Sequence, residues 1–277
     1  MKHGRVFAAA LLVLAQAAAV AQPAPTLPLW ELGIGVGGLS LPYYRGADRQ
    51  NNWLLPVPYA VYRGEVLRAD RNGVKALLFD SERMAFDVSL AATPPARSAD
   101  VPVRAGMPDL AGTLEIGPTL NVALARGSGW RAELRLPLRA AFTLESSPRA
   151  IGWAATPHVN VDHRLGAWNL GVQAGALWGS RRLHGYFYDV APAYASAARP
   201  AYQARAGSAG WQTTLALSRR DGKRWFGAFV RADTLAGSTL RESPLVQRRQ
   251  HVSAGLAVSW VLWESSRQVP APGSGGV

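Results

Sequence analysis

Three polar residues with catalytic potential, His158, Asn160 and Asp162, alternate along the sequence and so share one face of an extended segment. His163 lies on the other face. A histidine oriented by a polar partner can serve a hydrolase as its general base. The sequence nearby offers no serine in a distinctive setting as a nucleophile. We therefore favour a group of polar residues that bond across strands inside an enclosed lumen, and we predict no catalytic residue.

A set of charged residues alternates in the same way and contains both signs: Arg131, Glu133, Arg135 and Arg139. Mixed charges stabilise a polar lumen whatever passes through it, so we predict a structural charge ladder, with a pore lining as the alternative. The remaining histidines are isolated, and no spacing of histidine and carboxylate residues indicates a metal site. The sequence predicts neither a metal nor a cofactor.

These residues belong to long segments in which apolar and polar side chains alternate with a period of two. The segment Trp130–Glu145 is about 16 residues long, whereas strands of soluble sheets usually have about 5–6. A tilted membrane strand needs about 9–11 residues. Because backbone groups in hydrocarbon have no water to bond, a spanning sheet must close on itself.

The sequence thus predicts an all-β fold, a transmembrane antiparallel β-barrel of about 12 strands over residues 22–263. The predicted strands are Trp30–Leu39, Leu54–Arg63, Val66–Asp70, Gly73–Asp80, Met84–Ala92, Gly112–Leu124, Trp130–Glu145, Ile151–His163, Trp168–Trp178, Trp211–Leu217, Trp225–Thr234 and Val252–Leu262. Tryptophans at strand ends are typical of a membrane girdle. A secreted soluble sandwich is the alternative, which the length of the Trp130 segment disfavours.

Connections between the strands divide into short turns and long polar stretches. We expect tight turns at Asn72-Gly73, 126–129 and Asp221-Gly222. The longer stretches 93–111 and 189–210 are expected to form outer loops or insertions into the lumen.

The N-terminus carries the features of a signal peptide over residues 1–21. Lys2 and Arg5 precede an apolar stretch, and Ala19-Val20-Ala21 supplies small residues for cleavage. A membrane anchor is the alternative, but the apolar stretch is shorter than the roughly 20 residues that a spanning helix needs. At the other end we predict a disordered tail over residues 264–277.

Composition narrows the function further. The absence of cysteine excludes disulfides, thiolate metal sites, a cysteine nucleophile and a lipid-modified cysteine. The formal net charge is +12, but the basic residues are scattered singly, so we predict no nucleic-acid partner. Anionic lipid headgroups of an outer membrane, or an anionic glycan, suit such a surface better.

Several short motifs resemble those of the MltA-interacting protein (MipA)/OmpV family of outer-membrane proteins. They include Tyr44-Arg45-Gly46, Leu55–Tyr59, Tyr62–Glu65, Arg104–Leu110 and Glu115–Pro118. The positions that match are Tyr44, Arg45, Gly46, Pro56, Pro58, Tyr59, Tyr62, Arg63, Gly64, Gly106, Met107, Asp109, Gly117 and Pro118.

The resemblance implies a barrel in the outer membrane of a Gram-negative bacterium. It also implies a non-enzymatic scaffold that brings a murein lytic transglycosylase together with a bifunctional penicillin-binding protein; other members look like osmoregulated porins or adhesins. The sequence departs from a usual barrel because a tail follows the last strand, which ends near Trp263.

Two prolines inside one strand need a physical explanation. Pro56 and Pro58 lie two residues apart, so their missing N–H donors fall on the same side of the strand. An edge, a bulge or a strand end would accommodate them. In that arrangement we expect Tyr59 and Tyr62 to anchor at a membrane interface.

Overall fold

The computed structural model describes residues 26–63, 67–70, 73–76, 79–81 and 83–270. The predicted signal peptide, the matching position Gly64 and the turn residue Asn72 lie outside the described residues.

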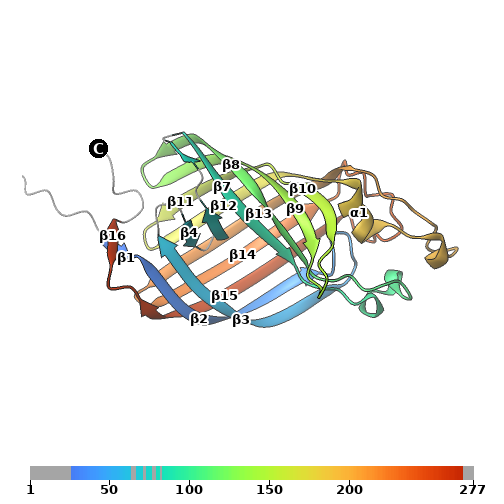
Figure 1. Ribbon diagram of the computed structural model, residues 1–277, viewed down its shortest axis with the longest axis horizontal. Coiled ribbons are helices and arrows are strands. Elements are labelled where there is room, and N and C mark those ends of the chain that lie inside the picture. The colour runs from blue at the N-terminus through green and yellow to red at the C-terminus, as the bar shows by residue number, and fades with distance from the viewer. Residues whose placement is uncertain (1–25, 64–66, 71–72, 77–78, 82, 271–277) are drawn as a thin grey trace, which may run out of the picture.

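Long antiparallel strands dominate the described chain and form one curved sheet (Figure 1). They are β2 (Trp30–Pro42), β3 (Gln50–Arg63), β7 (Met84–Thr93), β8 (Thr113–Gly127), β9 (Trp130–Thr143), β12 (Trp168–Gly179), β13 (Gly207–Asp221), β14 (Arg224–Thr234) and β15 (Gln250–Glu264). Neighbours in this series pair with each other except between β3 and β7 and between β9 and β12, where shorter strands intervene. The last strand of the series also lies beside the first, because β15 pairs with β2. The predicted transmembrane antiparallel β-barrel is confirmed.

Three short strands lie between β3 and β7. They are β4 (Leu67–Asp70), β5 (Gly73–Ala76) and β6 (Phe79–Asp80). β4 pairs with the end of β3, β5 lies against β7, and β6 pairs with β7. These segments correspond to two of the strands expected from the sequence.

The strand predicted over Ile151–His163 is divided into β10 (Ala150–Ala155) and β11 (His158–Leu165). Both parts pair with β9 and β12, and both keep one register, since Ala155 lies opposite Leu138 and His158 opposite Arg135. The division falls at Pro157, which has no N–H to donate. The prediction of one uninterrupted strand was wrong, although the ladder continues across the division.

Side chains alternate between an apolar outer surface and a more polar interior. Large apolar residues that a soluble fold would bury are exposed on the outer surface of nearly every long strand: Leu32, Ile34, Val36, Leu54, Leu90, Ile116, Leu136, Leu138, Val172, Leu215, Val230, Leu256 and Leu262. Tryptophans are exposed near both ends of this apolar band: Trp130, Trp168, Trp260 and Trp263 at one end, and Trp153, Trp178 and Trp211 at the other. The band matches the outward face of a membrane barrel.

The two ends of the barrel differ in their connections. At one end, two-residue turns join β8 to β9, β11 to β12 and β13 to β14. At the other end, long connections contain the helix α1 (Arg181–Tyr188) and the 3₁₀ turns η1 (Ser98–Asp100), η2 (Pro102–Arg104) and η3 (Pro192–Tyr194). Outer-membrane barrels have short periplasmic turns and longer extracellular loops. We therefore call the first the periplasmic end and the second the loop end.

Segments from both ends of the described chain meet at the periplasmic end (Figure 1). The strand β1 (Thr26–Pro28) pairs with β16 (Gln268–Pro270) in a separate two-stranded sheet. This differs from the disordered tail predicted from residue 264, because the sequence pattern of so short a pairing is too weak to detect. Residues 271–277 lie outside the described chain.

Pro56 and Pro58 lie on a strand edge, one of the three settings considered from the sequence. The N–H of Arg63 points toward β2, where it bonds to the carbonyl of Leu29. Because N–H groups alternate in direction along a strand, the even-numbered residues of β3 face away from β2. Within the described residues, β3 has a partner on that side only at Tyr62 and Arg63, so neither proline interrupts a ladder there.

The long connections fold into a cap at the loop end that has its own apolar core. Buried members come from four connections and adjoining strand ends: Tyr44, Ala47, Ala96, Val101, Leu110, Leu177, Tyr188, Val190, Ala204, Ala209, Leu240 and Leu245. No helix among the described residues is long and apolar enough to cross a membrane.

Substitution of a lipid-facing side chain tests the barrel. We expect Leu136→Arg, in the middle of β9, to lower the free energy of unfolding in lipid vesicles by about 2–4 kcal/mol, because arginine at mid-bilayer depth loses hydration. Denaturant titration measures the change. Leu262→Arg near the end of β15 is the control, with an expected cost of about 0–1 kcal/mol. If both substitutions lower the free energy of unfolding equally, Leu136 does not face the middle of the bilayer.

Candidate functional site

The charged residues of β9 lie on the lumen side and bond to neighbouring strands. Arg135 Nη2 lies 2.8 Å from Glu133 Oε2, and Arg131 Nη2 lies 3.1 Å from Asp162 Oδ2 on β11. On the other side, Arg139 Nε lies 3.1 Å from Glu115 Oε2 on β8. The charge ladder is thus a network of ion pairs that joins three strands.

The polar residues of β11 lie directly across from this ladder. Asn160 and Asp162 pair in register with Glu133 and Arg131, and Asn160 Nδ2 donates to Asp162 Oδ2 at 3.0 Å. His158 lies opposite Arg135 in the same register but bonds to the backbone. Its Nδ1 lies 2.7 Å from the carbonyl oxygen of Thr156, two residues away. The structure brings all three polar residues opposite the ladder, and within the described chain His158 forms no ion pair with a carboxylate.

Glu31 forms a second charged cluster near the periplasmic end, which sequence reasoning missed. Its side chain is fully buried, and Arg220 Nη1 donates to both of its carboxylate oxygens at 2.9 and 2.6 Å. Arg63 Nη2 lies 3.3 Å away, and Tyr59 Oη donates to Oε2 at 3.1 Å. The sequence signal that could have indicated this cluster is Glu31 itself, a single acidic residue in a glycine-rich apolar strand. The expected interfacial position of Tyr59 was wrong, because its hydroxyl points to this lumen cluster.

Asp233 forms a third cluster near the loop end. Its carboxylate lies 3.0 Å from Arg45 Nη2, 3.0 Å from Arg231 Nε and 3.4 Å from His251 Nε2. Arg45 is one of the matching motif positions. His251, which looked isolated in the sequence, therefore has an acidic partner across the β14–β15 pair.

The motif tyrosine Tyr44 binds the cap together. Its hydroxyl donates to the carbonyl of Leu245 at 2.8 Å, and its ring meets that of Tyr188 edge to face with centroids 6.0 Å apart. Tyr188 Oη donates to the Arg45 carbonyl at 2.7 Å. Burial raises the pKa of Tyr188 to about 12, so the hydroxyl stays a donor at any physiological pH.

Arg104 and the motif residues that follow it fasten the connection between β7 and β8. Arg104 is buried, its Nη1 donates to the Phe187 carbonyl at 3.1 Å, and burial lowers its pKa. Gly106 has φ +79°, Met107 packs against the cap core, and Asp109 accepts from the Ser98 N–H at 2.6 Å. These contacts agree with the expected loop turn.

Three further motif positions allow close backbone packing or a turn in the barrel and the cap. Gly117 faces the β8–β9 pair, where an added Cβ would collide with the Leu138 carbonyl, and Pro118 lies opposite Val88. Gly46 has φ +95° and sits beneath Leu235 and Val246.

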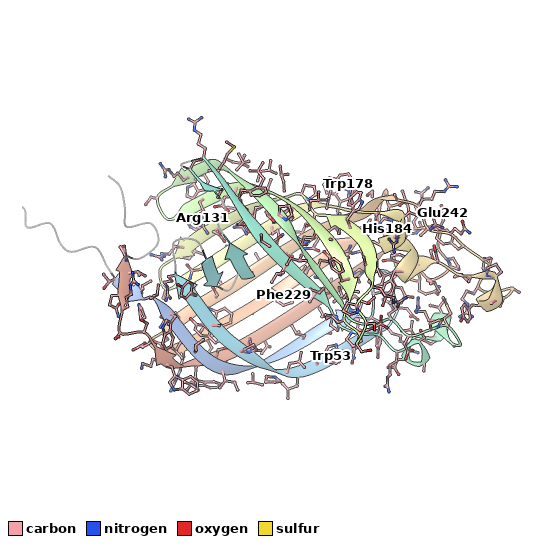
Figure 2. The ribbon with its side chains drawn as sticks, viewed as in Figure 1. Trp53, Arg131, Trp178, His184, Phe229 and Glu242 are labelled. Carbon is pink, nitrogen blue, oxygen red and sulfur yellow. The ribbon has the colours of Figure 1, made fainter. Side chains whose placement is uncertain are left out.

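The lumen contains an apolar hollow beside the charge ladder. The charge ladder lies on β8, β9 and β11, and a hollow of about 420 Å³ with a mostly apolar lining is bordered by β2, β3 and β12–β15 together with Asp162 of β11. The hollow is bordered by Leu39, Leu55, Val57, Ala216, Trp225 and Phe229, with Phe229 labelled in Figure 2. Among the described residues, no three histidine or acidic side chains gather closely enough to hold a metal ion.

Loss of the buried carboxylate tests whether the Glu31 cluster is structural. We expect Glu31→Ala to lower the free energy of unfolding by about 3–5 kcal/mol, because Arg63 and Arg220 lose a buried counter-charge. Denaturant titration in vesicles is the measurement. Arg97→Ala, which removes the exposed pair with Asp100 at 3.0 Å, serves as control with less than about 1 kcal/mol expected. A cost at Glu31 no larger than the control would refute the assignment.

Solved structures with a similar arrangement include outer-membrane proteins. The outer membrane phospholipase A of Escherichia coli is 9% identical with a TM-score of 0.33, and the match covers 83% of this chain and 92% of that one. The CymD monoaromatic hydrocarbon channel is 9% identical with a TM-score of 0.38, covering 85% and 89%. The Pseudomonas putida toluene transporter TodX is 11% identical with a TM-score of 0.27, covering 90% and 69%. Sequence identities and TM-scores as low as these give no information on the activity or substrate of this chain.

No curated protein matches the sequence. A family model does: the one described as MltA-interacting protein MipA matches residues 34–262, which is most of the chain and nearly the whole barrel. The expected family is confirmed, and with it a place in the outer membrane. The chain belongs to the MltA-interacting protein MipA family.

Proposed function

We propose that this barrel is a non-enzymatic scaffold that holds peptidoglycan-remodelling enzymes at the periplasmic face of the outer membrane. The observation that carries the proposal is the family match over residues 34–262, since the family description names an interaction with MltA. The partners are then a lytic transglycosylase and, beside it, a penicillin-binding protein. Export by the signal peptide over residues 1–21 is part of this proposal.

Internal bonding of the charged lumen residues supports a structural role over catalysis. Arg131, Arg135 and Arg139 each pair with a carboxylate, and His158 turns to its own backbone. The polar groups that a hydrolase would need as base and orienting partner are therefore engaged elsewhere.

The periplasmic end offers a surface that a soluble partner can reach. Exposed basic side chains surround its turns and the β1–β16 sheet: Arg126, Arg164, Lys223, Arg224 and Arg267. Among the side chains that the structure describes, the exposed acids nearby are Asp221 and Glu264, and Glu264 lies 3.5 Å from Lys223. A basic surface of this kind favours a partner with an acidic patch, since complementary charge speeds association.

Charge reversal at this end tests the scaffold. We expect Arg126→Glu with Arg164→Glu to weaken capture of a purified lytic transglycosylase by the detergent-solubilised barrel about tenfold or more, because like charges then meet. Surface-immobilised binding measures the affinity. The control is Arg181→Glu with Arg205→Glu at the loop end, which should bind like wild type. No binding by wild type, or equal loss in both variants, would overturn the proposal.

A porin-like channel for small solutes is the second candidate, and the lumen hollow favours it. Its mostly apolar lining suits uncharged apolar molecules better than ions. We expect Ala216→Trp, which fills the hollow, to reduce the flux of such a solute into proteoliposomes at least about fivefold, because the indole occupies much of about 420 Å³. Ala140→Trp on the outer face of β9 is the matched control. If the wild-type protein allows no flux of the solute, the channel hypothesis is wrong.

A further inference from the structure

A groove of about 910 Å³ opens on the outer surface where the apolar band meets the cap. Its floor is one row of the sheet, in which Thr213 lies opposite Ala232 and Ala232 opposite Val252. These residues alternate with buried His251 and Asp233, so they face outward. Trp211, more than half exposed at 56%, borders the groove beside the floor.

Two basic side chains stand at the upper rim of the groove. Arg49 comes from the connection between β2 and β3, and Arg248 from the connection between β14 and β15. Both are exposed, and neither has an ion pair within the described chain. Of the acids that border the groove, Asp48 is exposed, whereas Asp233 is buried and paired with Arg45, Arg231 and His251. The arginines are therefore available to an external anion.

Hydrogen bonds fix the backbone at this rim. The carbonyl oxygen of Gly46 accepts from the N–H of Gln247 at 2.8 Å and from that of Arg248 at 3.0 Å, which joins the two connections. Gln50, whose Nε2 donates to the Val252 carbonyl at 2.9 Å, ties the same rim to the floor. Because the rim is ordered before any ligand arrives, less entropy is lost on binding.

We propose that the groove binds a phosphorylated, acylated glycolipid of the outer leaflet. Arg49 and Arg248 hold its phosphate, since guanidinium groups form charge-assisted hydrogen bonds with phosphate oxygens. The floor of Thr213, Ala232 and Val252 receives the first part of an acyl chain, and Trp211 lies at the depth where indole rings favour the membrane interface. The position at the loop end, on the lipid side, distinguishes this lipid from a soluble phosphate compound.

Binding of purified bis-phosphorylated lipid A to the whole protein in detergent micelles, followed by native mass spectrometry, tests the site. We expect Arg49→Ala with Arg248→Ala to lower the apparent affinity about tenfold or more, because both phosphate contacts are lost. The matched control, Arg181→Ala with Arg205→Ala, removes two other exposed loop-end arginines and should leave affinity unchanged. Equal loss in both double variants would overturn the proposal.

A second variant separates the groove from the charges. Ala232→Phe fills the floor and keeps both arginines, and we expect it to weaken lipid A binding severalfold while retaining the wild-type heat-modifiable migration of a folded barrel. Lipid A lacking its phosphates should bind wild type no better than it binds the double arginine variant. Undiminished binding by Ala232→Phe, or binding of inorganic pyrophosphate as tight as that of lipid A, would contradict a lipid site.

Discussion

Backbone hydrogen bonding without water is the constraint on which the whole molecule depends. In hydrocarbon, each unpaired N–H or carbonyl costs several kcal/mol, so the strands must pair in a circle. The pairing of β15 with β2 brings the two ends of the long-strand series together, and β4, β5 and β6 span the interval between β3 and β7. The prolines of β3 fit this constraint, since their missing N–H groups fall on the side away from β2, where β3 has no ladder partner at these positions among the described residues.

Once the circle is closed, every strand has a lipid side and a lumen side, and charge must be neutralised inside. The clusters around Glu31, Asp233 and the β9 ladder are alike, because each pairs its carboxylates with arginines from the same strand, from other strands or from a loop. Such pairs add little net stability, but loss of one partner leaves a buried charge, which makes them hard to change. The lumen is therefore held together by its own side chains, and the surfaces left for partners are the periplasmic end, the cap and the lipid-facing rim.

The sequence predicted the barrel because its strongest signal, a period of two over more than ten residues, comes from the two-sided environment of each strand. It also placed the residues of the charge ladder on one face. It could not show that His251 meets Asp233, because strand register between β14 and β15 is a property of the folded sheet. The cap core was equally hidden, since Tyr44 and Leu245 are about 200 positions apart and have no periodic pattern. The break at Pro157 had a local signal, but the continuous alternation around it suggested one strand.

Single-cysteine spin labels offer the most direct measurement, because the natural chain contains no cysteine. Labels placed one at a time from residue 132 to 140 of β9 in vesicles would report collision with oxygen, which dissolves in lipid. We expect the accessibility of the labels to oxygen to rise and fall with a period of two, high at Leu134, Leu136 and Leu138 and low at Glu133, Arg135 and Arg139. Uniform accessibility along β9, or a maximum at the charged positions, would contradict a strand with lipid on one side and an enclosed lumen on the other.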